Sequence, residues 1–298
     1  MHVVVTGSSG MVGTELVDAL RGRGDRVTRL VRSLTAERDT THWDPEAGAL
    51  EPRVFDGVDA VVHLAGESIG AKRWTAEEKR RILESRTKGT GLLSRTLAGL
   101  GSKPRRMVSA SAVGIYGDRG DEVLTERSAL GDGGFMASVC REWEAATRPA
   151  EEAGIAVACI RSGVILSARA GLLPRLLLPF RLGLGGRMGS GRQYVSWISL
   201  PDEVAAILNL LDAELVGPVN LTSPNPVTNA ELANTLGQVL HRPTILPTPL
   251  LPVKLRYGAQ LVQELMLQGQ RVVPARLDPG ISFRHPRLEE ALRAVLDG

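Results

Sequence analysis

Length and composition indicate a folded globular protein. The 298 residues are 43% hydrophobic and 23% charged, which is near the globular average and allows a large core. The net charge is only +3, so the composition gives no reason to expect a nucleic-acid partner. The two cysteines, Cys140 and Cys159, form no CxxC pair and the histidines are scattered, so we predict no metal site.

No segment has the pattern of a targeting signal or a membrane span. The chain enters an apolar run at residue 2, without the charged and apolar regions of a signal peptide. Prolines and arginines interrupt the apolar run at residues 172–184, so it cannot cross a bilayer. We therefore expect a cytoplasmic protein that acts without a membrane partner.

The N-terminal half alternates short apolar runs with amphipathic stretches. Strands are expected at residues 2–6, 26–31, 59–64, 106–110 and 156–161, and helices from residue 11 to about 22, at 75–100 and at 137–152. Continuous apolar runs rich in β-branched residues are typical of parallel strands that are covered on both faces. This alternation predicts the α/β class, with a doubly wound parallel sheet.

A glycine-rich loop, residues 7–13, joins the first strand to the first helix. Gly7 would permit the tight turn, Gly10 would let the backbone approach a diphosphate, and Gly13 would let the helix pack closely on the strand. The diphosphate would then lie at the helix N-terminus, beside Met11 and Val12, where free N–H groups favour negative charge. Its position directly after a strand makes this a predicted dinucleotide site of the Rossmann type.

The end of the second strand indicates which dinucleotide binds. Enzymes that use NAD(H) usually place an acid here for the ribose 2′-hydroxyl, but no acid follows Val31 before Glu37. Arg32 instead offers a guanidinium to a 2′-phosphate, so we predict NADP(H) rather than NAD(H). The alternative is that Arg32 is only a solvated strand end.

The amino-acid composition changes after residue 165, where glycine and proline become frequent. Helices are expected at residues 201–211, 229–240, 255–267 and 287–296, and Ser199 with Asp202 is a plausible helix start. We divide the chain into a dinucleotide-binding Rossmann domain at 1–165, completed by about 195–215, and a smaller, interleaved C-terminal substrate domain at 166–298.

Four motifs together resemble the extended short-chain dehydrogenase/reductase pattern. They are the glycine loop, His63-Leu64-Ala65-Gly66, Ser109-Ala110-Ser111 followed by Tyr116-Gly117, and residues 189–202. Residues 73–86, 178–186 and 269–274 are similar to one atypical branch, the "epimerase family" proteins described as nucleoside-diphosphate-sugar epimerases, which carry a small C-terminal domain. The resemblance covers nearly the whole chain, and it implies the following cofactor-binding residues: Gly7, Gly10, Met11, Val12, Gly13, Val31, Arg32, Leu64, Ala65, Gly66, Arg86, Ser109, Gly163 and Ile165.

The catalytic pattern departs from that superfamily. Its enzymes generally use a Ser together with a Tyr and a Lys spaced YxxxK, and Ser111 aligns with the Ser. Met136 and Cys140 stand at the Tyr and Lys positions, and neither can perform the task, since Met has no proton to give and a thiol cannot supply a cation. Two substitutes are conceivable: Arg86 as the cation and Tyr116 as the proton donor, although its position favours a packed turn residue for Tyr116.

Two hypotheses of different class follow. The first is an NADP(H)-dependent oxidoreductase or epimerase for a small polar metabolite, with a nucleotide sugar as one candidate and Arg161 and Arg192 as substrate-binding residues or structural ion-pair members. The second is a catalytically degenerate NADP(H)-binding regulator or scaffold, since some members of the branch resemble cell-division regulators. Related enzymes often dimerise through two long helices, so residues 75–100 could form a homodimer contact.

Overall fold

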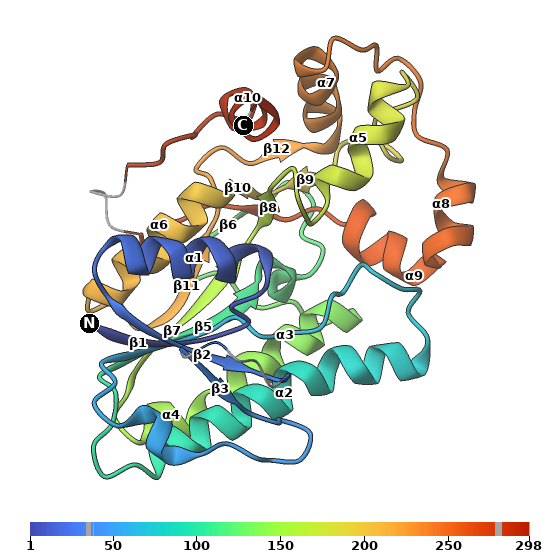
Figure 1. Ribbon diagram of the computed structural model, residues 1–298. Coiled ribbons are helices and arrows are strands. Elements are labelled where there is room, and N and C mark those ends of the chain that lie inside the picture. Colours follow the sequence, from blue (N-terminus) through green and yellow to red (C-terminus); the bar gives the residue numbers. More distant parts are fainter. Residues whose placement is uncertain (34–36, 38, 278–281, 298) are drawn as a thin grey trace.

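A seven-stranded parallel sheet forms the centre of the computed structural model, which describes residues 1–33, 37, 39–277 and 282–297 (Figure 1). Across the sheet the strands follow the order β11 (Gly217–Leu221), β7 (Ala156–Ser162), β5 (Arg106–Ala112), β4 (Ala60–His63), β1 (His2–Thr6), β2 (Arg26–Val31) and β3 (Thr40–His42). Every neighbouring pair is parallel. All strands therefore end at one side of the sheet, which we call its carboxyl end.

Helices cover both faces of this sheet (Figure 1). On one face lie α1 (Met11–Gly22) and α6 (Leu200–Asp212), and on the other α2 (Ala76–Ala98), α3 (Phe135–Ala145) and α4 (Arg148–Glu152). Alternate residues of β1 feed two cores, because Val3 and Val5 belong to the cluster with α1 and α6, whereas Val4 belongs to the cluster with α2 and α4. The fold class predicted from the sequence is thus confirmed.

The C-terminal domain is smaller and lies beside the carboxyl end of the sheet (Figure 1). Its helices are α5 (Leu173–Arg181), α7 (Asn229–Val239), α8 (Leu250–Tyr257), α9 (Ala259–Val262) with a π-turn at Gln263–Leu267, and α10 (Leu288–Asp297). Three small sheets join β8 (Val164–Leu166) to β10 (Trp197–Ser199), β9 (Tyr194–Val195) to β12 (Val227–Thr228), and β6 (Val123–Leu124) to β13 (Arg271–Val272). Short helical turns occur at Pro52–Phe55 and Val113–Tyr116.

Several expected elements differ in extent from those observed. The expected helix at 137–152 is two helices, with Pro149 at the start of the second, where a residue without an N–H is tolerated. The expected helix at 255–267 instead begins at Leu250 and breaks at Gly258, whose φ of 90° is open to glycine but not to most residues. The predicted helix start at Ser199 is confirmed, since its side chain accepts from the Asp202 N–H.

The Rossmann domain is closed later in the chain than expected. Strand β11, which completes the sheet at its edge, lies at Gly217–Leu221, just beyond the interval 195–215. Within the described ranges no helix is long and apolar enough to cross a membrane, and no cluster of residues could hold a metal ion.

Candidate functional site

The carboxyl end of the sheet contains the point where the strand order reverses. Strand β1 lies between β2 and β4, so the connections from β1 and β4 leave in opposite directions and open a crevice there. The glycine loop follows β1, Arg32 follows β2, and Leu64, Ala65 and Gly66 follow β4. The structure thus brings three of the predicted cofactor-binding segments to one place.

The glycines of the loop are required by its geometry. Gly7 has a φ of +67°, and a Cβ there would lie 2.7 Å from the Leu64 carbonyl carbon. A Cβ on Gly13 would lie 2.2 Å from the Gly7 carbonyl oxygen, so helix α1 could not approach β1 if this residue were larger. A Cβ on Gly10 would meet only that same oxygen, at 3.2 Å, so its outer side is open. The loop therefore has the shape of a phosphate cradle.

Helix α1 offers its N-terminus to this cradle. No side chain caps the helix at Gly10, and its first turn holds no acidic residue. The unpaired N–H groups and the helix dipole therefore favour an anion here. The Thr6 hydroxyl fixes the adjoining strand end by accepting from the N–H groups of Leu64 (3.2 Å) and Ala65 (3.3 Å).

Arg32 is exposed at the end of β2, and its surroundings leave it available. The neighbouring carboxylates of Glu37 and Asp39 both pair with Arg29, the latter at 2.7 Å. Within the described part of the chain no carboxylate pairs with Arg32. Arg29 and Arg21, which also pairs with Asp39, therefore neutralise the local acids, and among the described residues nothing competes with an anionic ligand for the Arg32 guanidinium.

Arg86 is a buried cation on α2 whose side chain reaches the segment after β4. Its Nη2 donates to the Glu67 carbonyl (3.0 Å), its Nη1 donates to the Ile82 carbonyl (3.1 Å), and Trp143 stacks on it at 4.8 Å. The side chain is 8% exposed, its Nε has no hydrogen-bond partner, and no ion pair to it occurs among the described residues. Burial lowers the pKa of the Arg86 guanidinium, so an anion arriving beside Gly66 would relieve a real electrostatic cost.

Ser111 belongs to a polar network on the α3 face of the sheet. Its hydroxyl donates to Glu144 Oε1 at 2.7 Å, and the same carboxylate receives two hydrogen bonds from Arg161, at 2.8 and 2.9 Å. Glu144 therefore links the predicted catalytic serine to Arg161. No role was predicted for Glu144, because nothing local shows that residues 33 and 17 positions away meet it.

Tyr116 and Arg161 are embedded in this network rather than open to a ligand. Tyr116 is fully buried, its hydroxyl donates to Asn220 (2.7 Å), and it accepts from Arg161 (2.9 Å). Burial raises the pKa of the Tyr116 phenol. A direct proton-donor role for Tyr116 and a substrate-binding role for Arg161, which is 3% exposed, do not fit this arrangement. Both residues bind structural partners instead.

The positions of the missing YxxxK pair are filled by apolar packing. Met136 and Cys140 lie on α3 against Gly114, whose Cβ would be 3.5 Å from the Met136 Cβ and 4.0 Å from the Cys140 Sγ. Burial raises the pKa of the Cys140 thiol to about 12, so the group is neutral at physiological pH. Neither residue supplies a charge or an accessible proton.

The remaining predicted residues divide between open and buried positions. Ile165 and Met11 both lie beside Gly171. A Cβ on Gly171 would be 3.6 Å from the Ile165 carbonyl oxygen and 3.9 Å from the Met11 sulfur. Ser109 is fully buried within β5, so the predicted cofactor contact does not fit it. Arg192 is exposed, as a substrate-binding residue must be. Val12, Val31 and Gly163 are half-buried.

One buried acid next to this site was missed in the sequence. Glu203 on α6 accepts a hydrogen bond from Ser162, the residue before Gly163, at 2.6 Å. Its other carboxylate oxygen is buried without a partner, and burial raises the pKa of Glu203 to about 8. An acid in the first turn of a predicted helix is usually interpreted as a solvated residue that interacts with the helix dipole. Only the fold shows that Glu203 is buried.

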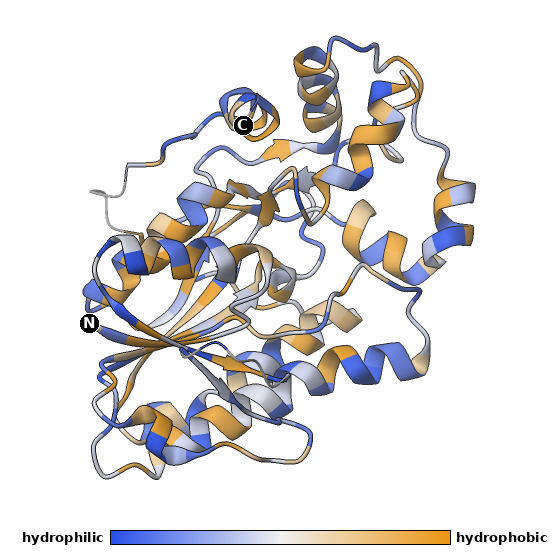
Figure 2. Cartoon of the chain, viewed as in Figure 1, coloured by the Kyte–Doolittle hydropathy of each residue, from blue (hydrophilic) through white to orange (hydrophobic). Residues whose placement is uncertain are grey.

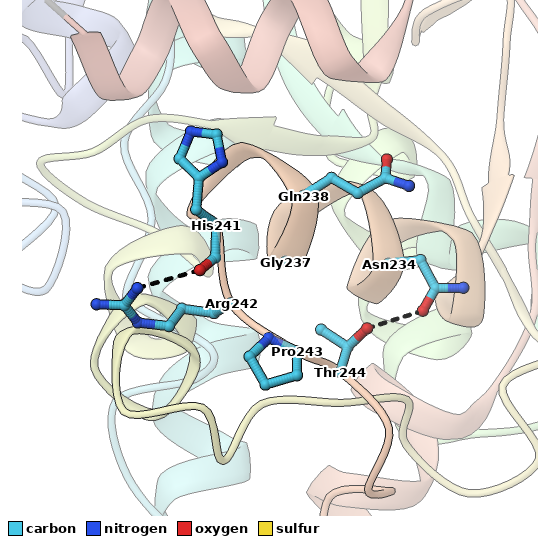
Figure 3. Close-up of a pocket in the computed structure, with 7 residues that line it drawn as sticks. All are labelled: Asn234, Gly237, Gln238, His241, Arg242, Pro243 and Thr244. Carbon is cyan, nitrogen blue, oxygen red and sulfur yellow. Dashed lines mark hydrogen bonds between the residues drawn. The ribbon is translucent and has the colours of Figure 1, made fainter.

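A second hollow lies away from the glycine loop, at the C-terminal end of α7 (Figure 3). Its walls hold two hydrogen bonds, from Thr244 to Asn234 (3.0 Å) and from Arg242 to the His241 carbonyl (3.1 Å). It lies in the C-terminal domain, and none of the predicted site residues lines it. It is lined by Asn234, Gly237, Gln238, His241, Arg242, Pro243 and Thr244.

Comparison with known proteins agrees with this geometry. An epimerase family protein of Mycobacterium tuberculosis is 43% identical over 292 residues, which are 97% of this chain and 96% of the relative. The crystal structure of human epimerase family protein SDR39U1 with NADPH has a TM-score of 0.90 and 33% identity, and the match covers 100% of this chain and 99% of that chain.

The nucleoside-diphosphate sugar epimerase of Corynebacterium glutamicum has a TM-score of 0.82 and 37% identity, and the match covers 99% of this chain but 58% of that one. A domain of unknown function, DUF1731, matches residues 248–295, from near the start of α8 to α10. The model of the NAD dependent epimerase/dehydratase family matches residues 3–221, from the first strand to the last strand of the sheet. The chain therefore belongs to the NAD dependent epimerase/dehydratase family.

Proposed function

We propose that this protein binds NADP(H) at the carboxyl end of the sheet. The observation that carries the proposal is the combination of a glycine cradle that admits no Cβ at Gly7 or Gly13 with an exposed Arg32 at the end of β2 that pairs with no carboxylate among the described residues. The cradle and the N-terminus of α1 suit the diphosphate, and Arg32 suits a 2′-phosphate. The similar human protein with NADPH in its crystal structure supports this choice over NAD(H).

We further propose an oxidoreductase or epimerase activity on a small polar metabolite. A bound nicotinamide supplies or accepts the hydride, and the protein supplies orientation and charge. Because Glu144 receives the one proton of the Ser111 hydroxyl, the Ser111 oxygen would accept a hydrogen bond from the reacting hydroxyl of the substrate. Arg86, a buried cation with no ion pair among the residues that the structure describes, would stabilise negative charge in place of the missing Lys.

A nucleoside-diphosphate sugar is the substrate class we favour. The similar Corynebacterium glutamicum protein is described as a nucleoside-diphosphate sugar epimerase. In this chain Arg192 is exposed in the segment between β8 and β9, where its guanidinium could pair with a diphosphate.

Calorimetric titration with NADPH and NADH tests the cofactor. For Arg32→Ala we expect affinity for NADPH to fall about 10–100-fold, the value of one charge-assisted contact, while affinity for NADH stays unchanged. Arg26→Ala, an exposed arginine at the opposite end of β2, is the matched control and should bind like the wild type. Equal affinity of the wild type for both cofactors would refute the phosphate-binding role of Arg32.

A second candidate, a regulator or scaffold that binds NADP(H) without catalysis, is favoured by one observation. Met136 and the neutral, buried Cys140 stand where the superfamily has its proton donor and its cation. NADPH oxidation with a panel of carbonyl substrates, including keto-sugar nucleotides, separates the two. Turnover that Arg86→Met abolishes and Arg86→Lys partly keeps supports the enzyme. Binding of NADPH without any turnover supports the regulator.

A further inference from the structure

Large aliphatic side chains stand exposed along one side of the C-terminal domain, although such residues normally occupy a core. They have exposed fractions from 61% to 89%. We call this group the leucine surface. It consists of Leu178 on α5, Leu182 and Leu184 in the loop after α5, Ile245 and Leu246 in the connector after α7, and Leu251 and Leu255 on α8.

Contacts between the elements that carry these side chains hold the elements side by side. The connector lies against the loop after α5, where Arg242 Nε donates to the Arg181 carbonyl at 2.8 Å. Further along, the Thr248 N–H donates to the Arg187 carbonyl at 2.9 Å. Helices α5 and α8 meet where Arg175 stacks on Tyr257 at 6.0 Å. Figure 1 shows these elements together at the outer margin of the domain, and Figure 2 shows apolar residues along them.

The surface is also strongly basic. Residues 168–200 and 232–263 contain eight arginines and lysines and no acid, whereas the rest of the chain has 28 basic and 33 acidic residues, a net charge of −5. Five of these cations are exposed beside the apolar side chains: Arg181, Arg187, Arg242, Lys254 and Arg256. The complementary partner is therefore anionic as well as apolar.

We propose that the leucine surface docks the protein on an anionic lipid bilayer. Aliphatic side chains interspersed with cations suit the boundary between acyl chains and negatively charged headgroups. A protein interface would be expected to offer Trp and Tyr anchors, but Tyr257 is half-buried between Arg175 and Arg256. A symmetric contact with a second copy would bring like charges together.

This docking differs in kind from spanning. The expectation of no membrane partner rested on the absence of a segment that could cross a bilayer, and a surface that lies on the membrane needs no such segment. The carboxyl end of the sheet, where the cofactor is proposed to bind, lies on the side of the sheet nearest this domain (Figure 1). A docked protein could thus meet a substrate held at the lipid surface.

Sedimentation with vesicles tests the proposal on the full-length protein. We expect binding to vesicles of equal parts phosphatidylcholine and phosphatidylglycerol, and none to phosphatidylcholine alone. Lys254→Gln with Arg256→Gln should weaken binding roughly 25-fold, at about fivefold per charge. Leu251→Gln with Leu255→Gln should weaken it at least about tenfold.

A matched control changes residues that lie away from the leucine surface. Val216→Gln with Lys103→Gln, which replaces an exposed aliphatic residue and an exposed cation near the amino ends of the strands, should bind vesicles like the wild type. All variants should keep the wild-type melting temperature and NADPH affinity. A wild type that ignores anionic vesicles overturns the proposal. A dimer that dissociates on the leucine substitutions, seen by light scattering, would assign the surface to a second copy instead.

Discussion

Among the described carboxyl groups, Glu203 is expected to make the free energy of unfolding depend most strongly on pH. Burial raises its pKa from 4.5 to about 8, so the folded protein holds a proton that the unfolded chain releases. The stability contributed by the neutral acid is therefore fully present below pH 4.5 and is lost as the pH rises through 8.

Glu203→Gln should remove this loss. The amide oxygen can still accept from Ser162, and no charge forms in the core at high pH. We expect a free energy of unfolding about 3–5 kcal/mol above that of the wild type at pH 9, and a much smaller difference at pH 5, measured by urea denaturation. The exposed Glu152→Gln serves as the control. A constant difference between the two pH values would contradict the assignment.

His63 should give the free energy of unfolding the opposite dependence on pH, in the acidic range. Its ring is fully buried between the hydroxyls of Thr6 (2.7 Å) and Thr90 (2.9 Å), and burial lowers its pKa from 6.5 to about 4. The neutral form's stability is fully present above pH 6.5 and is lost as the pH falls through 4, about 3 kcal/mol in all. His63→Gln should flatten this part of the stability profile, and an unchanged slope between pH 6.5 and 4 would refute the role of His63.

The sequence could locate residues whose task is local, but not those with distant partners. The turn at Gly7, the packing of Gly13 on the Gly7 carbonyl and the place of Arg32 after a strand are all set within a few residues of chain, so the sequence alone could locate them. For Tyr116 the sequence left a proton donor and a packed turn residue both open, because its partner Asn220 lies 104 positions away and a hydroxyl looks the same from sequence whether open or buried.

At the scale of elements, helix α3 depends on a residue from the other domain. Its N-terminus begins at Gly134 without a side-chain cap of its own, and Glu264 reaches across to accept from the Met136 N–H at 2.9 Å. A carboxylate at a helix N-terminus also interacts favourably with the dipole. The helix that holds Glu144 and Cys140 is therefore fixed by the C-terminal domain.

Glu264→Ala should lower the free energy of unfolding by about 1 kcal/mol, the usual value of a cap. Glu264→Gln, which keeps an oxygen but loses the charge, should fall between this variant and the wild type. Chemical denaturation measures the order of the three proteins. Equal stability of Glu264→Ala and the wild type would show that water replaces the carboxylate without cost.

Elements with a strong hydrophobic period were predictable, and those defined by tertiary contact were not. Strands β1, β2, β4, β5 and β7 contain apolar, β-branched stretches, so their positions followed from the sequence. Strand β11 (Gly217–Leu221) contains Pro218 and Asn220, and only pairing with β7 makes it a strand. The short β3 and the β6–β13 pair likewise exist because of their partners.

At the scale of the whole molecule, the chain returns from its C-terminal domain to the Rossmann sheet. Strand β13 pairs with β6, and the Ser196 hydroxyl donates to the Gln270 carbonyl and accepts from the Val272 N–H. Leu277 and the half-buried Phe283 pack on the core beneath α1 and α6. Residues of the C-terminal segment thus contribute to the core of the sheet, and we expect the two domains to unfold together. The homodimer predicted from the long helix, now α2, stays a prediction for light scattering.

Substitution of Glu126 provides the clearest test of whether the two domains unfold together. Its buried carboxylate accepts from the N–H groups of Asn220 (3.0 Å) on the sheet edge and of Ala275 and Arg276 (each 3.2 Å) in the returning tail. Glu126→Gln places an NH2 group among these donors, so we expect a loss of about 2–3 kcal/mol, with one calorimetric transition at a lower temperature. Glu122→Gln, exposed in the same segment, should leave that temperature unchanged. Two separate transitions in the wild type would mean that the domains unfold independently. The hydrogen bonds of Glu126 to the sheet edge and to the returning tail would then not be enough to couple the unfolding of the two domains.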